Sequence, residues 1–91
     1  MNSVWRVEFD DRASRELKDL GPSAERQIVR YLLKQLATTA DPRRFGKPLA
    51  GHLHGTWRWR VGNYRILGEI HHGLLVVLVI RVGHRKDVYD F

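Results

Sequence analysis

The stretch 56–67 constrains the fold most, because its alternation predicts a β-hairpin with one apolar and one cationic face. Its sequence is TWRWRVGNYRIL. A two-residue turn at 62–63 places Arg60 directly opposite Arg65, with Arg58 two residues further along the same face. Like charges that face each other across a sheet are destabilising. The hairpin therefore predicts a bound phosphate, and by extension a nucleic acid; the alternative is a solvated basic strand face.

Composition restricts the chain to one small basic domain, expected to span residues 1–91. The net charge of +6 favours a polyanionic partner such as nucleic acid, an anionic membrane surface or an acidic protein. The absence of cysteine removes disulfides and zinc-thiolate sites and fits a reducing compartment. The N-terminus lacks the apolar core of a signal peptide, and the longest apolar run, 74–80, is too short to cross a bilayer. We therefore expect a cytoplasmic protein with no membrane partner.

Hydrophobic periodicity in the first half of the chain predicts one strand and a helical hairpin. Residues 4–9 alternate as a half-buried strand, and Asp10 or Asp11 can cap a helix that runs to Leu20. Pro22 suits the first turn of a second helix. The apolar stripe of that helix comprises Ile28, Val29, Leu32, Leu33 and Leu36.

The second half of the chain predicts three more strands. Residues 41–55 are rich in Gly, Pro and cations and are interpreted as a connection without regular elements. The basic hairpin follows and continues to about Ile70. A turn at 71–73 leads into residues 74–82, which are apolar almost throughout, as expected of a central strand covered on both faces. The predicted order is β-α-α-β-β-β, and the cations and tyrosine of 83–91 suggest a site beside the hairpin.

Three motifs resemble the RelE branch of the RelE/ParE toxin superfamily, the small bacterial toxins of type II toxin–antitoxin systems. They are Gly46–Leu49, Gly62–Ile66 and Val82–Tyr89. With the helical hairpin ahead of them they cover nearly the whole chain. The resemblance implies an α/β fold of the α+β type, in which two N-terminal helices pack on a twisted, mostly antiparallel sheet of about four strands. This RelE-like microbial RNase fold agrees with the element order derived above.

The same resemblance implies an endoribonuclease that cleaves mRNA in the ribosomal A site without a metal or other cofactor. Carried over by position, the functional residues of the family fall on Arg58, Arg60, Arg65, Arg85 and Tyr89. Some members have lysine where this chain has Arg58 and Arg60, which leaves the identity of the general base open. The chain also stops two residues after Tyr89 with no additional helix, which bears on how a partner docks.

Cleavage of RNA without a metal uses the ribose 2′-OH as the nucleophile, which requires a base, an acid and charge stabilisation. Arginine stays protonated and suits only the last task, as a clamp on the phosphate oxygens. His84 is the candidate base or acid, and neighbouring cations favour its neutral form; alternatively it is a turn residue that caps a strand end. Tyr89 is expected to stack on or orient a base, and Lys86 to contact backbone phosphate.

Other polar groups fit less specific roles. Arg43, Arg44 and Lys47 are either ribosomal RNA contacts or a solvated loop.

The histidine pairs 52/54 and 71/72 lack a cysteine or carboxylate cluster to complete a metal shell, so no metal site is predicted. Trp57 and Trp59 are expected in the core rather than in an RNA stacking platform. The carboxylates of Asp10, Asp11 and Glu16 fit helix capping better than catalysis.

The preferred function is a ribosome-dependent mRNA endonuclease toxin. Its expected partners are the ribosome with its mRNA and a cognate, acidic, RelB-like antitoxin that covers the basic face. The toxin alone is expected to be a monomer that forms a hetero-oligomer with the antitoxin. Two alternatives stay open: a ParE-like toxin that poisons DNA gyrase, and a non-catalytic RNA-binding module.

Overall fold

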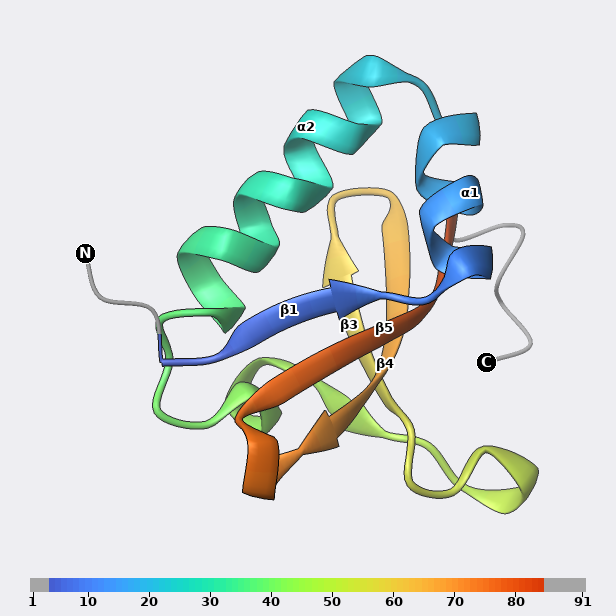
Figure 1. Ribbon diagram of the computed structural model, residues 1–91. Helices are drawn as coiled ribbons and strands as arrows, with labels where there is room; N and C mark the ends of the chain where they lie inside the picture. Colours follow the sequence, from blue (N-terminus) through green and yellow to red (C-terminus); the bar gives the residue numbers. More distant parts are fainter. Residues whose placement is uncertain (1–3, 85–91) are drawn as a thin grey trace.

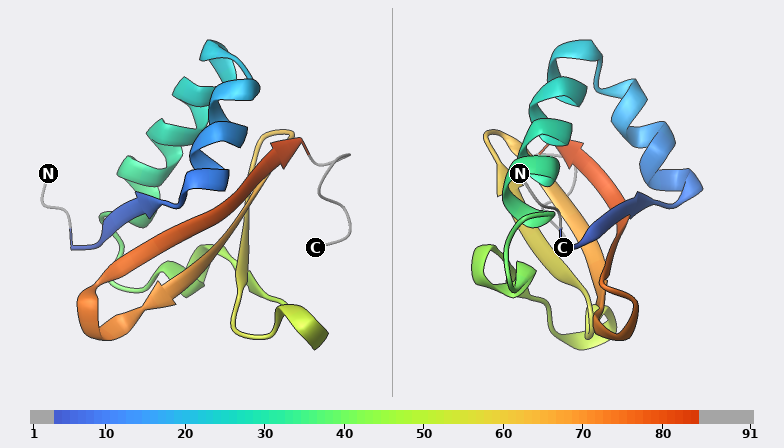
Figure 2. Two further views of the ribbon diagram at one scale, coloured as in Figure 1. Left: turned by 45° about the vertical axis from the view of Figure 1, so that its right-hand side comes forward. Right: turned by 60° about the vertical axis from the view of Figure 1, so that its left-hand side comes forward.

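The computed structural model describes residues 4–84, in which two helices lie on one face of a five-stranded mixed sheet (Figures 1 and 2). The strands are β1 (Arg6–Phe9), β2 (Lys47–Pro48), β3 (Trp57–Val61), β4 (Tyr64–His71) and β5 (Val76–His84). The order across the sheet is β1-β5-β4-β3-β2, with β1 parallel to β5 and the other pairs antiparallel. The predicted α+β class is confirmed, but the expected number of strands was four.

The additional strand, β2, lies in the segment that was predicted to lack regular elements. Residues 41–55 contain this strand and two short 3₁₀ helices, Pro42–Phe45 and Gly51–Leu53. β2 pairs with β3 through Lys47 opposite Arg58 and Pro48 opposite Trp57. A two-residue strand that contains proline carries no periodic signal, and proline is tolerated there because β2 is at the edge of the sheet.

The helical hairpin follows its predicted boundaries. α1 spans Asp11–Asp19, and the Asp10 carboxylate caps it by accepting a hydrogen bond from the Ala13 backbone N–H at 2.8 Å. α2 spans Pro22–Tyr31 and continues as a π-helical turn over Leu32–Leu36. Within residues 4–84 neither helix has the length and hydrophobicity that crossing a bilayer requires.

The apolar stripe of the second helix is narrower than predicted. Ile28, Leu32 and Leu36 are buried, whereas Val29 is half-buried and Leu33 is 55% exposed. Successive residues of a helix differ by about 100°, so Leu33 leaves the face on which Leu32 meets the sheet.

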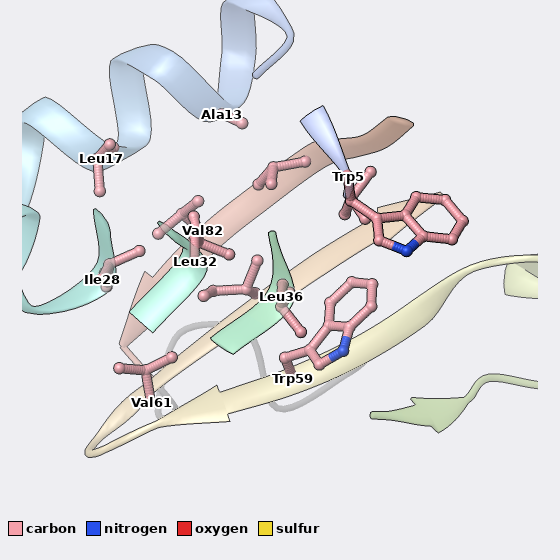
Figure 3. Close-up of a cluster of buried hydrophobic side chains, with 12 residues drawn as sticks. Trp5, Ala13, Leu17, Ile28, Leu32, Leu36, Trp59, Val61 and Val82 are labelled. Carbon is pink, nitrogen blue, oxygen red and sulfur yellow. The ribbon is translucent and has the colours of Figure 1, made fainter. Parts of the chain in front are cut away.

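Trp59 of β3 belongs to the core between the sheet and the helices (Figure 3). Its side chain is fully buried, and the indole N–H donates a 3.0 Å hydrogen bond to the Pro42 carbonyl. Trp5 is also buried, and Trp57 is partly buried against the same cluster. Trp59 therefore joins the 42–45 helix to the sheet, and the predicted core role of the tryptophans is confirmed.

A β-bulge in β5 changes which side chains of this strand face the core. Leu67 pairs with Arg81 but Gly68 pairs with Val79, so Ile80 is an additional residue on β5. The insertion lets both Val79 and Val82 face the core, although they are three residues apart.

The close approach of Gly68 to the core can be tested by substitution. An added Cβ would lie 2.8 Å from the Leu78 carbonyl oxygen and 3.1 Å from Cζ3 of Trp59. We expect Gly68→Ala to lower the free energy of unfolding by about 1–3 kcal/mol in urea titrations, because the backbone must shift. Gly73→Ala is the matched control, since nothing lies within 4 Å of its Cβ. Equal effects of the two substitutions would contradict this account of the packing.

Candidate nucleic-acid interface

A group of cations on β2, β3 and β4 lies on the sheet side that points away from the helices and is here called the basic face: Lys47, Arg58, Arg60 and Arg65. Trp59, Val61 and Ile66 belong to the core, so the residues that alternate with them point to the opposite side. Arg60 is directly opposite Arg65, and Lys47 is opposite Arg58. The sheet thus brings together three arginines that the sequence placed on one hairpin face, and β2 adds Lys47.

Two small adjoining hollows shape this face. One, of about 130 Å³, is lined by Phe45, Lys47, Arg58 and Arg60. The other, of about 80 Å³, is lined by Arg60, Gly62, Tyr64 and Arg65. Both are well below the roughly 300–1,000 Å³ of a typical small-molecule site. Because Arg60 borders both hollows, the face suits a chain of small anionic groups better than one bulky cofactor.

The positively charged arginines of the basic face repel one another. Burial lowers the pKa of the Arg58 guanidinium, and the positive charges of Arg60 and Arg65 lower it further. Arginine nevertheless stays protonated in proteins, so the repulsion is not relieved by loss of a proton. An anion bound between these groups would relieve it.

Arg65 is half-buried within the sheet. It lies between Arg60 on β3 and the buried Gly83 on β5. Its Nε is buried and has no hydrogen-bond partner among residues 4–84. A buried donor on a charged group is costly when it is unpaired, so this N–H is poised for an acceptor that is not part of the described chain.

His84 lies on the opposite side of the sheet from the arginine pair. It pairs in register with Tyr64, and Tyr64 in turn pairs with the core residue Val61. The His84 and Tyr64 rings meet edge to face, with centroids 5.8 Å apart and planes at 84°. The residue that was predicted to act as the base or acid therefore lies beside Tyr64 and not among the guanidinium groups.

The remaining predicted residues divide into two groups. Arg43 forms an ion pair with Asp41, with 2.7 Å between Nη2 and Oδ2. The Arg44 guanidinium lies 5.8 Å from the centroid of the Phe45 ring, which lines the larger hollow. Three further predicted site residues lie outside the described residues and stay predictions: Arg85, Lys86 and Tyr89.

Sequence reasoning assigned Glu16 to helix capping, but the structure places its carboxylate against β5. It accepts a hydrogen bond from the Val82 backbone N–H at 3.0 Å and from Nε of Arg81 at 3.0 and 3.2 Å. β1 ends at Phe9, so Glu16 supplies at Val82 an acceptor that a strand partner would otherwise provide. The available signal was Arg81 itself, a lone charge in an apolar strand that requires a partner.

Metal-binding groups are not gathered anywhere in the described part of the chain. Within residues 4–84 no three His, Cys, Asp or Glu side chains lie close enough together to hold a metal ion.

Comparisons with known proteins agree with this fold. A family model described as "ParE toxin of type II toxin-antitoxin system, parDE" matches residues 7–89. The chain is 36% identical over 85 residues to Toxin RelG of Mycobacterium tuberculosis (strain ATCC 25618 / H37Rv), covering 93% of this chain and 95% of that protein.

Solved structures show the same similarity. A chain of the RelBE2 toxin–antitoxin complex from M. tuberculosis matches with a TM-score of 0.81 and 36% identity, over 89% of this chain and 98% of that chain. The isolated E. coli RelE toxin matches with a TM-score of 0.67 and 26% identity, over 94% and 92% of the two chains. The molecule is thus a toxin of a type II toxin–antitoxin system. It belongs to the ParE toxin family of the RelE/ParE superfamily, as its motifs predicted, and its relatives are RelE toxins.

The Glu16 contacts predict a measurable contribution to stability. Glu16→Ala removes the ion pairs with Arg81 and Arg12 and the acceptor for Val82, and should lower the free energy of unfolding by about 2 kcal/mol. Glu16→Gln keeps an oxygen acceptor and should cost less. Glu8→Ala is the control, because the exposed Arg6–Glu8 pair should contribute at most about 1 kcal/mol. Urea titrations in which Glu16→Ala and Glu8→Ala are equally destabilised would refute this role of Glu16.

The Asp41–Arg43 pair predicts a pH dependence. The hydrogen bond from the Arg43 side chain lowers the pKa of Asp41 from 3.8 to about 2. The pKa of Asp41 is lower in the folded state than in the unfolded state, so the charged carboxylate stabilises the fold above about pH 4. This stabilisation is lost as the pH falls from about 4 to about 2. The stability difference between the wild type and Asp41→Asn should shrink over that interval. In an Arg43→Gln background the same difference should be smaller and less dependent on pH.

Proposed function

We propose that this toxin is a ribosome-dependent endoribonuclease that cleaves mRNA by attack of the ribose 2′-OH, without a metal, and so inhibits translation. The observation that supports this most is the direct cross-strand opposition of Arg60 and Arg65, with the buried Nε of Arg65 lacking a partner among the described residues. Paired guanidinium groups supply planar, bidentate donors that match the oxygens of a phosphodiester.

The reaction places its greatest demand on charge stabilisation. Attack of the 2′-oxygen gives a five-coordinate phosphorane with an additional negative charge, and cleavage then releases the 5′-oxygen. Arg60 and Arg65 would hold the non-bridging oxygens of this intermediate, and Arg58 would stabilise it from the adjoining hollow. Such donors act strongly here because they are fixed by the sheet before the substrate arrives.

Proton transfer and further binding are assigned to other residues, of which His84 lies on the opposite face of the sheet from the arginine pair. His84 is proposed as the base or acid, and Arg85 as a fourth guanidinium donor. Tyr89 would orient a base and Lys86 would contact backbone phosphate.

Contacts to ribosomal RNA are proposed for the cations beside the larger hollow. Lys47 and Arg44 suit this role because Lys47 lines the hollow and Arg44 lies over Phe45 at its edge. Arg43 should contribute less, since its guanidinium is already paired with Asp41.

The proposed protein partner is an acidic, RelB-like antitoxin that covers the basic face. Structures of relatives contain such pairs, including the RelBE2 complex from M. tuberculosis and a RelB–RelE complex from Methanococcus jannaschii. We propose that the free toxin is a cytoplasmic monomer and that it forms a hetero-oligomer with its antitoxin. Acidic side chains would occupy the positions that phosphates take during catalysis, so binding of antitoxin and RNA would be mutually exclusive.

A second candidate is a toxin that poisons DNA gyrase, which the ParE description of the matching family model favours. The opposed arginines and their hollows argue for the first candidate, because a gyrase-binding protein has no need of a phosphate clamp. A non-catalytic RNA-binding module would use the same charges but would leave the message intact.

The proposed function can be tested by cell-free translation followed by primer extension on the message. The wild-type toxin should produce cuts within codons, and Arg65→Ala or Arg60→Ala should lower the cleavage rate by about 10²–10³-fold. Arg26→Ala is a matched control, because Arg26 is exposed on α2 and the helices cover the other face of the sheet. Intact message together with inhibited DNA supercoiling would establish the gyrase alternative, and neither effect would favour the binding module.

A further inference from the structure

We propose that Tyr64 contacts the substrate by stacking on a nucleobase next to the phosphate held by Arg60 and Arg65, and that His84 positions its ring. This inference rests on RNA being the ligand of the basic face, as in the proposed function. It assigns the recognition of a base, in addition to phosphate, to a residue whose type and position gave no signal in the sequence.

Tyr64 lies on the apolar face of the hairpin but also lines a hollow that is bordered by the arginines of the basic face. It is the first residue of β4, directly after the tight turn, and it lines the 80 Å³ hollow together with Arg60, Gly62 and Arg65. The arginines alternate to the basic face, while Tyr64 shares the other face with Val61. Gly62, in the turn between Arg60 and Tyr64, adopts a φ of 58° and lines the same hollow.

The ring is held but not enclosed. Tyr64 is half-buried and packs against the core, and His84 meets it edge to face at 5.8 Å. An edge-to-face contact fixes the plane of an aromatic ring more than its area of contact alone would. His84 therefore acts on the hollow through Tyr64, as a positioning residue.

The combination of groups matches a single-stranded nucleotide better than a free anion. Guanidinium groups bind the phosphate, whereas an aromatic face beside them offers a platform for a base that has left its stack. Stacking of this kind tolerates different bases, because every base has a π-face. The hollow should thus require a base at that position while showing little preference for its identity.

The test compares short single-stranded RNAs that cannot be cleaved, each with a 2′-deoxy nucleotide at one position, and versions that lack one base. Binding to the full-length wild-type protein, measured by fluorescence anisotropy, should weaken about tenfold when one particular base is absent. Tyr64→Phe should keep this discrimination, whereas Tyr64→Leu should bind both RNAs equally. Tyr31→Leu, a half-buried tyrosine on α2, is the control and should keep it.

Two outcomes would overturn the inference: discrimination that survives in Tyr64→Leu, or a wild type that binds every abasic RNA as well as the complete one. Because these RNAs are not cleaved, the result does not depend on catalysis. A toxin that shows base discrimination but cuts no message would retain this inference while the proposed endonuclease fails.

Substitutions of His84 separate positioning from proton transfer. His84→Ala should weaken RNA binding by about fivefold through loss of the edge-to-face contact, and His84→Phe should restore it, because an aromatic edge replaces the imidazole. Phenylalanine cannot transfer a proton. Rescue of binding by His84→Phe therefore supports the positioning role, and binding that stays as weak as in His84→Ala contradicts it.

Discussion

Burial of Trp59 is the constraint on which the basic face depends. Side chains alternate along a strand, so an indole that fills the core commits Arg58 and Arg60 to the opposite face of β3. The hydrogen bond from Trp59 to the Pro42 carbonyl also fixes the segment that leads into Lys47. The same packing that stabilises the fold therefore aligns the cations. A register slip that exposed the indole of Trp59 would bury Arg58 and Arg60 instead.

This arrangement stores unfavourable electrostatic energy at the site. Opposed arginines repel each other, and the Nε of Arg65 lacks a partner within residues 4–84. The core beneath them tolerates the cost because its apolar residues are almost completely buried. Natural proteins often retain such locally unfavourable groups where a ligand is bound. In the proposed function, the substrate and the antitoxin both relieve the repulsion, and this explains how one face can serve two competing partners.

Features with a local signal could be predicted from the sequence, and features set by distant contacts could not. The Asp10 cap, the Pro22 start and the Arg60–Arg65 pairing follow from short-range rules, and each agrees with the structure. The contact of Glu16 with Val82 joins residues 66 positions apart, so no spacing rule reveals it.

The face occupied by His84 could likewise not be predicted from a pattern of alternation, because the additional residue Ile80 reverses the parity of β5.

Pairing of β1 with β5 has a consequence for biosynthesis. β5 lies between β1 and β4, yet it is translated roughly 70 residues after β1, so the sheet cannot close early. An isolated two-stranded hairpin is at best marginally stable in water, and β3 with β4 alone would not hold the arginines in place. The sheet that carries the arginines therefore cannot be completed until most of the chain has been synthesised.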